Sequence, residues 1–356
     1  MKNFISKLAL TLCVASTLVM CTNKPSDKKG KLEYTPLNFP KTENVKVTLI
    51  KGDYAIAGGR NLRIVGDKII IPAANTDNKH QIQVFDTKSN KFVASFGTSG
   101  RGEGELVGYT EYDVNIEKNE FYAEWQNKYV IYDLAKVISG QTGYLKEQGF
   151  HKNINSTRTI FYLDNDRILH LGAHPRFIIT SKNLQDTLGR YDERHYISKF
   201  FANHKDPDFQ RRYMGNNGIF TLKPDGSKFV NSFYSGFYMQ IFDIKNNKIT
   251  AGEECRFVEA RMKNELAAMS DCITGPYCMD STDDYIYIMY SEGFDFDFSE
   301  PRLGVFDWNG KEVKNYILDM MAYSFVMTPD GKRCYCMVHR KDRIPPVPSD
   351  GPLPRG

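Results

Sequence analysis

The sequence has little that points to nucleic-acid binding or to catalysis. Its formal net charge is +4, and discounting Lys2 and Lys7, which lie in a segment that we expect to be removed, leaves about +2 without a basic block. A nucleic-acid-binding protein needs clustered lysine and arginine, so we expect no nucleic-acid partner. A G-x-S-x-G nucleophile elbow and S-x-D-x-G-x-T-W boxes are absent, which argues against a peptidase with a serine-hydrolase domain and against a sialidase.

The apolar run near the N-terminus is too short to span a bilayer as a helix. Leu8 to Met20 has 13 residues and follows Lys2 and Lys7, which is the pattern of a secretory signal peptide. It ends in LVMC at Cys21, which resembles a lipobox, with Met20 where Gly, Ala or Ser is usual. The resemblance implies acylation of Cys21, for example with palmitate, and anchoring in a lipid bilayer. The alternative is plain secretion, in which Cys21 has no role.

The cysteines of the mature chain match no redox or zinc motif. Beyond Cys21 they are an odd number, so at least one thiol stays free even if disulfides form after export. Cys334 and Cys336 are two residues apart on an expected strand, which is not the C-x-x-C spacing, and no second pair offers zinc-ligand spacing. We expect core packing for these side chains. They are Cys255, Cys272, Cys278, Cys334 and Cys336.

A short strand motif repeats along the chain. The run that ends in QVFD at Asp86 recurs as YVIYD, FIITS, MQIFD and LGVFD, and the ends of the copies lie 47, 48, 62 and 64 residues apart. Both faces of the motif are apolar, as expected for a sheet that is packed on each side. We expect the terminal Asp or Ser to accept hydrogen bonds from backbone N–H groups of the next turn. The terminal residues are Asp86, Asp133, Ser181, Asp243 and Asp307.

A hairpin pattern accompanies each copy of the motif. Six pairs of apolar runs flank turns rich in Gly, Asn, Asp or Pro. Four short strands per repeat at this period indicate a β-propeller. We therefore predict an all-β fold, a six-bladed β-propeller with four-stranded antiparallel blades and short helical inserts. The hairpins lie at 61–72, 112–125, 159–172, 219–234, 276–290 and 325–338.

The ends of the repeat raise the question of how the ring closes. Only five second hairpins are clear, and the run VKVTLI at 45–50 is strand-like. Because open sheet edges are a liability, we expect this run to complete the last blade beside Arg333–Val338. The two longer intervals contain inserts at 191–214 and 255–271, for which we expect helices. Residues 341–356 are rich in proline, which cannot form a central strand.

These features together resemble a known family. The lipobox-like leader, the six modules and the junction FGTSGRGEGEL are similar to TolB-like six-bladed β-propeller lipoproteins of Gram-negative anaerobes. The junction also resembles the link between blades of NHL-type propellers, which we favour over a phosphate cradle because a strand, not a helix, follows it. The resemblance spans Val45 to His339. It implies a cell-envelope location and a binding or scaffolding role, and it carries over no catalytic residue.

Two surface segments are candidates for ligand or partner binding. The loop SEGFDFDFSEP carries carboxylates that suit Ca²⁺, although without EF-hand spacing; the alternative is an exposed acidic loop. Its candidate metal ligands are Glu292, Asp295, Asp297 and Glu300. The insert around 190–212 is basic and is a candidate for contact with an anionic partner; the alternative is a solvated charged face. Its candidate contact residues are Arg190, Arg194, Arg211 and Arg212.

Two functions follow from this pattern. We favour an envelope lipoprotein, anchored through acylated Cys21 and facing the periplasm, whose propeller binds or scaffolds a protein or glycan. The alternative is a propeller hydrolase or lyase, similar to lactonases, for which only Asp113, Asn115 and Asp280 on first strands are candidates. We predict no cofactor other than the Ca²⁺ named above. The chain then divides into a signal peptide (1–20), a tether (21–44), the propeller (45–340) and a proline-rich tail (341–356).

Overall fold

The computed structural model describes thirteen segments of the chain. They are residues 33–50, 61–72, 79–107, 111–125, 128–150, 159–164, 166–172, 177–183, 185–191, 218–233, 236–259, 275–291 and 300–338. The chain divides into two units, 1–33 and 34–356, and every described strand belongs to the second. Within the described segments, no helix has the length and apolar character needed to cross a membrane.

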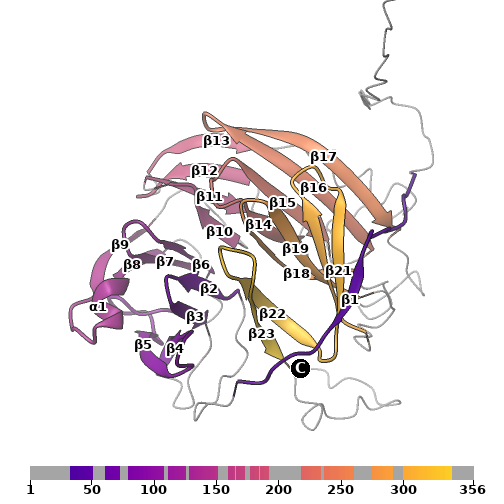
Figure 1. Cartoon of the computed structure of the whole chain (residues 1–356). Coiled ribbons are helices and arrows are strands. Elements are labelled where there is room, and N and C mark those ends of the chain that lie inside the picture. Colours follow the sequence, from indigo (N-terminus) through magenta and orange to yellow (C-terminus); the bar gives the residue numbers. More distant parts are fainter. Residues whose placement is uncertain are drawn as a thin grey trace, which may run out of the picture. The chain divides into compact units, whose positions relative to one another are not determined.

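Five antiparallel sheets of four consecutive strands form blades 1 to 5 (Figure 1). Blades 1 and 2 contain β2 (Arg63–Val65), β3 (Lys68–Pro72), β4 (His80–Asp86), β5 (Phe92–Thr98), β6 (Glu111–Asn115), β7 (Glu120–Trp125), β8 (Lys128–Asp133) and β9 (Leu145–Phe150). Blades 3 and 4 contain β10 (Thr159–Tyr162), β11 (Arg167–Leu171), β12 (Phe177–Ser181), β13 (Thr187–Tyr191), β14 (Gly218–Leu222), β15 (Lys228–Phe233), β16 (Phe237–Lys245) and β17 (Lys248–Val258). Blade 5 contains β18 (Pro276–Ser281), β19 (Tyr285–Tyr290), β20 (Arg302–Asp307) and β21 (Glu312–Leu318).

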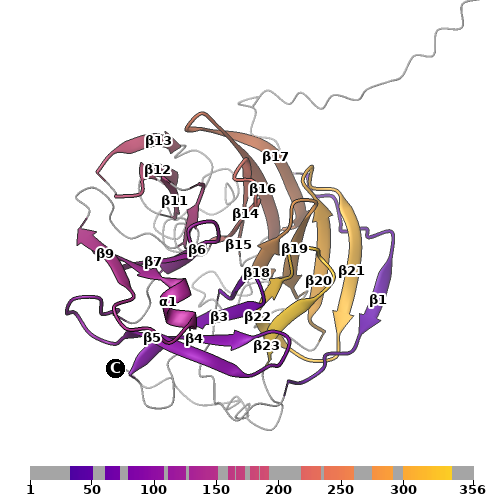
Figure 2. The same ribbon diagram turned by 60° about the vertical axis from the view of Figure 1, so that its left-hand side comes forward.

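A sixth sheet has two strands among the described residues. It is the hairpin of β22 (Ala322–Met327) and β23 (Cys334–Val338), visible beside blade 1 in Figure 2. All six first hairpins that the sequence predicts are therefore present. The β-propeller with four-stranded antiparallel blades is confirmed, whereas the predicted count of six four-stranded blades is not, because five sheets reach that size.

Apolar side chains join each sheet to the next. Six core clusters lie between sheets, and each cluster takes residues from two neighbouring sheets: blades 1 and 2, 2 and 3, 3 and 4, 4 and 5, blade 5 and the hairpin, and the hairpin and blade 1. In the last cluster, Val326 of β22 packs with Leu62 and Ile69 of blade 1. Burying both faces of every sheet explains why the strand motif is apolar on both sides.

Four of the five predicted turn caps are present. The Asp86 carboxylate accepts hydrogen bonds from the Lys88 and Ser89 N–H groups at 3.1 and 2.7 Å, and Asp133, Ser181 and Asp307 each accept one or more from the turns that follow them. Asp243 is the exception. It lies within β16 and pairs with Lys228, because β16 continues to Lys245 and the turn comes later, at Asn246 and Asn247 with positive φ.

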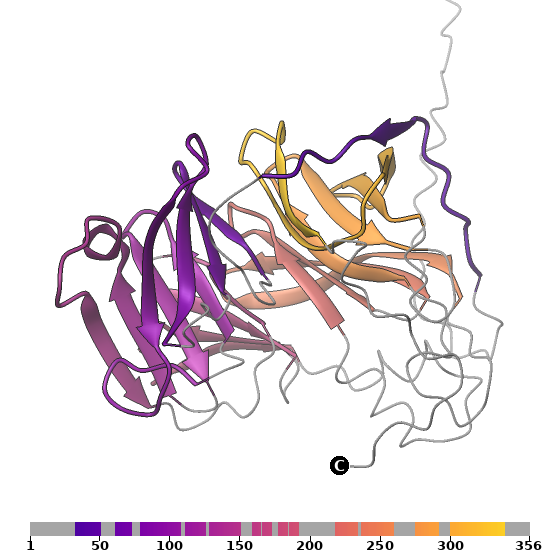
Figure 3. The same ribbon diagram turned by 90° about the horizontal axis from the view of Figure 1, so that it is seen from below.

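The run at 45–50 does not complete the last sheet, contrary to the prediction, and only its first residue, Val45, is part of a strand. β1 (Thr42–Val45) pairs in parallel with β21, as the outer, fifth strand of blade 5 (Figure 3). Three contacts account for this position. Glu43 forms an ion pair with Lys314 at 2.8 Å, Phe39 packs against Phe306, and Val45 packs on the cluster of blade 5 and the hairpin. The sheet thus begins at Thr42, three residues before the expected boundary at Val45.

The helical content differs from the expected inserts. The helix in the described chain is α1 (Leu134–Ile138), which links β8 to β9 and is capped by Asp133. The insert predicted at 255–271 begins on β17, so its first residues are strand and not helix. The rest of it, the other insert beyond Tyr191, the signal peptide, the first half of the tether (21–32) and the tail lie outside the described residues.

The thiols within the described residues are free, and most pack against the core as predicted. Cys255 packs on the cluster of blades 4 and 5, and Cys278 and Cys336 pack on the cluster of blade 5 and the hairpin, while Cys334 on β23 is exposed. Burial raises the pKa of Cys278 to about 12 and that of Cys336 to about 11, so both are protonated at neutral pH. Cys272 lies outside the described residues.

Candidate functional site

The first strands of the sheets place side chains at one equivalent position. First strands contact one another from sheet to sheet, for example β6 with β10 and β18 with β22. In blades 1 to 5, one first-strand residue lies opposite the third residue of the second strand. These residues are Arg63, Asp113, Phe161, Thr221 and Asp280. In the hairpin, Val326 is equivalent to Thr221, because each lies three residues before a Pro-Asp-Gly turn. Three of them are charged, which makes this position the candidate site.

Asp113 is shared between two neighbouring blades. Its Oδ1 accepts a hydrogen bond from Arg63 Nε at 2.7 Å, and its Oδ2 accepts one from the Tyr162 N–H at 2.8 Å. The Arg63 guanidinium also lies over the rings of Tyr112 and Phe161, at 5.7 and 5.5 Å from their centroids. Although burial opposes its charge, Asp113 raises the pKa of Arg63, so the guanidinium is a permanent cation. The arrangement links blades 1, 2 and 3.

Asp280 makes the same kind of contact between blade 5 and the hairpin. Its Oδ2 accepts a hydrogen bond from the Met327 N–H of β22 at 2.6 Å. In both blades the carboxylate thus binds the N–H group one residue beyond the equivalent position of the next sheet. Burial raises the pKa of Asp280 from 3.8 to about 6, and hydrogen bonding to Met327 and the charge of Arg63 offset that rise only in part.

Three other polar residues of the first strands bridge sheets or cap a turn. Thr221 Oγ1 donates to Ser281 Oγ at 3.0 Å, and Ser281 in turn donates to the Leu222 carbonyl at 2.7 Å, which links blades 4 and 5. Asn115 accepts a hydrogen bond from the Lys118 N–H in its own turn, at 3.0 Å. Of the three candidates for a hydrolase, Asp113 and Asp280 therefore join sheets and Asn115 caps a turn.

A buried polar cluster between blades 2 and 3 was missed by the sequence reasoning. His170 is fully buried, with Nε2 at 3.0 Å from Thr180 Oγ1 and Nδ1 at 3.4 Å from Glu124 Oε2. The Tyr122 hydroxyl donates to the same carboxylate at 3.1 Å. Such a network fixes the contact between two sheets, and its two sequence-distant halves give no local signal. The second histidine of that region, His174, lies outside the described residues.

Glu120 carries a second link between the same blades. Its buried carboxylate accepts from Lys146 and Lys182, both at 2.6 Å. Burial opposes its charge, but these hydrogen bonds lower the pKa of Glu120. A sequence signal exists in retrospect, because Glu120 begins a second strand where Lys68 and Lys228 begin theirs. Those lysines pair with Asp86 and Asp243 on the third strands opposite.

The glycine-rich junction between blades 1 and 2 is closed on itself. Leu106 is buried in the shared core, the Gly100 N–H donates to its carbonyl at 2.9 Å, and the Gly102 N–H donates to the Glu105 carboxylate at 2.6 Å. Gly100 and Gly104 have positive φ, which glycine adopts without strain. The N–H groups of Gly100 and Gly102 therefore form hydrogen bonds within the link itself, in accord with the predicted structural role.

The predicted surface sites are only partly within the described chain. Glu300 is half-exposed and pairs with Arg302, and Arg190 is an exposed residue of β13. The other candidate residues, Glu292, Asp295, Asp297, Arg194, Arg211 and Arg212, lie outside the described residues, and so does Cys21. Within the described part of the chain, no three His, Cys, Asp or Glu side chains are grouped as a metal site would require.

Strand order places these surface segments at one end of the sheets. First and second strands, and third and fourth strands, are joined at one end by the capped turns described above. The connections from second to third strands and from one blade to the next leave from the opposite end. The acidic loop at 292–299 links β19 to β20 and the basic insert links β13 to β14, so both leave from that second end.

Comparison with known proteins places the chain among propellers. A family described as "TolB-like 6-blade propeller-like" matches residues 38–330. Among solved structures, a Bacteroides fragilis protein described as exported is 16% identical, with 78% of this chain and 79% of that chain covered and a TM-score of 0.49. Hydrazine synthase of Kuenenia stuttgartiensis is 12% identical, with 81% and 94% covered and a TM-score of 0.46. No curated protein matches the sequence.

Proposed function

Because this chain belongs to the TolB-like 6-blade propeller-like family, we propose that it is a cell-envelope lipoprotein whose propeller binds or scaffolds a protein or glycan. The observation that carries this proposal is the use of the polar first-strand residues. The side chains of Arg63, Asp113 and Ser281 form hydrogen bonds with neighbouring blades. Such bonds hold a rigid scaffold together, whereas a catalytic centre directs its polar groups toward a substrate.

The binding surface is proposed at the strand ends that carry the long connections. The connection from β13 to β14 spans 26 residues, 192–217, whereas the turn from β2 to β3 takes two, Gly66 and Asp67. Propeller-type scaffolds hold loops in place for recognition, since the loops are free to vary while the sheets keep the fold. Arg190, Arg194, Arg211 and Arg212 supply positive charge there for an anionic partner.

The proposal also covers anchoring and blade count. The leader and Cys21 support acylation, with palmitate among the acyl groups, and export to the periplasm-facing side of a Gram-negative membrane. For the sixth blade, we propose that β22–β23 is its inner half, because this hairpin packs on blade 5 at one side and on blade 1 at the other.

Partner capture with charge-reversed variants tests the binding role. The tagged, full-length protein is isolated from native envelopes in three forms: unaltered, with Arg194, Arg211 and Arg212 changed to Glu, and with Lys88, Lys311 and Lys332 changed to Glu. The second set lies in exposed turns at the opposite end of the sheets and matches the change of net charge. We expect one envelope component to be enriched at least about tenfold by the unaltered protein and the turn variant, and lost with the insert variant.

Two results would count against the proposal. Recovery of the same component by all three forms would place the contact elsewhere, and no enrichment with any form would favour the hydrolase alternative. Anchoring is tested separately by membrane fractionation and palmitate labelling of Cys21→Ser. Continued labelling or membrane retention of that variant would refute lipid attachment at Cys21.

A further inference from the structure

One second strand has an outer edge that no other described strand covers. In blades 1 to 5 the third strand pairs with the second strand, whereas β23 pairs with β22 alone among the described strands. The second strands β15 and β19 are buried along most of their length, but Tyr335–Val338 of β23 are partly exposed and Cys334 is exposed. The outer edge of β23 therefore presents backbone N–H and C=O groups with which a further strand can pair.

The turn of this hairpin matches the first turn of blade 4. Both turns contain the sequence Pro-Asp-Gly. The Thr328 N–H donates to the Arg333 carbonyl at 2.8 Å, and the Lys223 N–H donates in the same way to the Lys228 carbonyl at 2.9 Å. Arg333 and Lys228 each lie two residues beyond the glycine of the turn. Arg333 of the hairpin is therefore equivalent to Lys228 of blade 4.

In two blades, a basic side chain at this position pairs with an acid on the third strand. Lys228 lies opposite Asp243 in blade 4, and its Nζ donates to the carboxylate at 2.5 Å. Lys68 lies opposite Asp86 in blade 1, and the same contact measures 2.9 Å. Arg333 is exposed and forms no ion pair with any residue that the structure describes. An acid at the end of an added strand would face Arg333 as Asp243 faces Lys228.

Charge and proline content favour a strand from a partner protein over two other occupants. Basic residues lie on both sides of β23 in the sequence, so antiparallel pairing of two copies of β23 would place basic residues opposite basic residues. The tail at 341–356 contains five prolines, which cannot donate to a strand ladder. A partner strand with an acidic end meets neither obstacle. The basic residues that flank β23 are Lys332, Arg333, His339, Arg340 and Lys341.

We propose that the outer edge of β23 binds an extended segment of a partner protein as an antiparallel strand, with an Asp or Glu opposite Arg333. By the register of blade 4, the two residues before that acid lie opposite Cys334 and Tyr335, and apolar side chains there cover both. Main-chain hydrogen bonds supply affinity, and the charged pair sets the register. This inference rests on the proposal that β22–β23 is the inner half of the sixth blade, and it is separate from the partner surface at the insert.

A peptide with the sequence of a third strand is the probe for this edge. We choose HQIQVFD, the sequence of β4, because it ends in the aspartate that pairs with Lys68 in blade 1. Binding of the fluorescently labelled peptide to the full-length mature protein is measured by anisotropy, and its place is found by amide hydrogen exchange. We expect the bound peptide to slow exchange in Cys334–Val338, because an added strand protects the amides of the edge with which it pairs.

An exchange of charges tests the pairing with Arg333. We expect Arg333→Glu to bind the peptide at least about fivefold more weakly than the unaltered protein does. The Asp86→Lys form of the peptide should show the reverse preference and bind Arg333→Glu more tightly than the unaltered protein. Lys311→Glu is the matched control, because it makes the same change of charge in an exposed turn of blade 5, and it should bind the original peptide as the unaltered protein does.

Several results would overturn the proposal. It fails if the peptide does not bind at about 1 mM, if binding slows exchange elsewhere but not in β23, or if the charge exchange has no effect. Slow exchange of β23 in the unbound monomer would show that the chain's own residues cover the edge, and a dimer in sedimentation with β23 protected would assign the edge to a second copy. The variant with Arg194, Arg211 and Arg212 changed to Glu should bind the peptide normally, so loss of the partner surface at the insert leaves this test intact.

Discussion

Replacing Asp280 with asparagine should remove a pH-dependent loss of stability. Burial raises the pKa of this carboxyl from 3.8 to about 6, so the folded state holds the proton more tightly than the unfolded chain. The stabilising effect of protonation is complete below the unfolded pKa and is lost as pH rises through about 6. Asparagine keeps an oxygen for the Met327 N–H, which lies 2.6 Å from Asp280 Oδ2, and it cannot ionise.

The magnitude follows from the shift in pKa. One pKa unit corresponds to about 1.4 kcal/mol, so a shift of roughly two units sets an upper limit of about 3 kcal/mol. Water contact at the partly exposed Asp280 side chain lowers this limit. We therefore expect the free energy of unfolding of Asp280→Asn, relative to the unaltered protein, to increase by 1 to about 3 kcal/mol between pH 4 and pH 7.5.

Urea unfolding at pH 4.5, 5.5, 6.5 and 7.5 measures the difference at each pH. Other groups titrate equally in both proteins and cancel. Asp330→Asn is the control with the opposite sign, because hydrogen bonds from Thr328 and Lys332 lower the pKa of Asp330, and its stabilising effect is lost as pH falls. A variant Asp280→Asn that is less stable at pH 7.5, by an amount that does not change with pH, would refute the reasoning.

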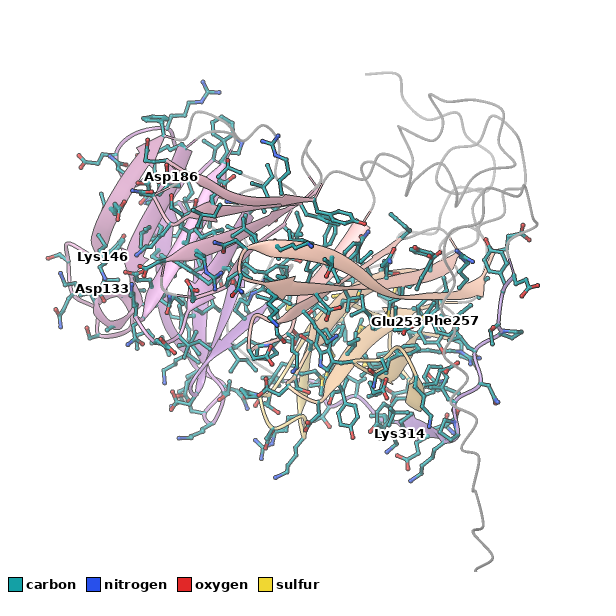
Figure 4. All side chains as sticks on the ribbon, turned by 90° about the horizontal axis from the view of Figure 1, so that it is seen from above. Asp133, Lys146, Asp186, Glu253, Phe257 and Lys314 are labelled. Atoms are coloured by element: carbon teal, nitrogen blue, oxygen red, sulfur yellow. The ribbon has the colours of Figure 1, made fainter. Side chains whose placement is uncertain are left out.

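Three further substitutions test the packing of the sheets. Phe177→Ala removes a fully buried ring whose centroid lies 5.1 Å from that of Phe229 and 5.0 Å from that of Phe242. In denaturant unfolding we expect the free energy of unfolding to fall by about 3–5 kcal/mol. The exposed control, Phe150→Ala, should lower it by less than about 0.5 kcal/mol. Gly189→Ala places a Cβ 1.9 Å from the Asn247 carbonyl oxygen. In Gly140→Ala the new Cβ meets no atom within 4 Å, and the only cost is backbone strain at its positive φ. We therefore expect Gly189→Ala to lower the melting temperature more than Gly140→Ala. Glu43→Lys breaks the 2.8 Å ion pair with Lys314, which is labelled in Figure 4. It should speed hydrogen exchange in Thr42–Val45 without lowering global stability. Unchanged exchange would show that the ion pair does not hold β1 in place.

Local patterns account for what was predicted correctly. Each first hairpin needs only two apolar runs and a turn, and the cap at Asp86 needs only a carboxylate within three residues of its N–H donors. Such contacts are made between near neighbours, so composition and spacing suffice. Asp243 shows the limit of this reasoning, because the motif is the same but the strand runs on to Lys245.

Long-range contacts account for what was predicted wrongly or missed. The outer strand of each sheet offers an edge, and β21 pairs with the N-terminal strand because Glu43 and Phe39 contact Lys314 and Phe306 of blade 5, which lie far along the chain. The links from Asp113 to Tyr162 and from Asp280 to Met327 join residues 49 and 47 positions apart. No spacing rule predicts that both carboxylates bind the next sheet, or that Asp280 but not Asp113 stays partly exposed.

The amino-acid sequence by itself determined the module: short runs that are apolar on both faces, separated by turn formers and repeated until several sheets exist that cannot bury both faces alone. Only the tertiary structure decided how the modules meet. It placed β1 on blade 5, left β22–β23 as a two-stranded sheet among the described residues, and set Asp280 beside water while Asp113 is neutralised by Arg63. The reason is physical: hydrogen bonds within a hairpin form between neighbours in the chain, whereas the environment of a charge depends on every sheet packed around it.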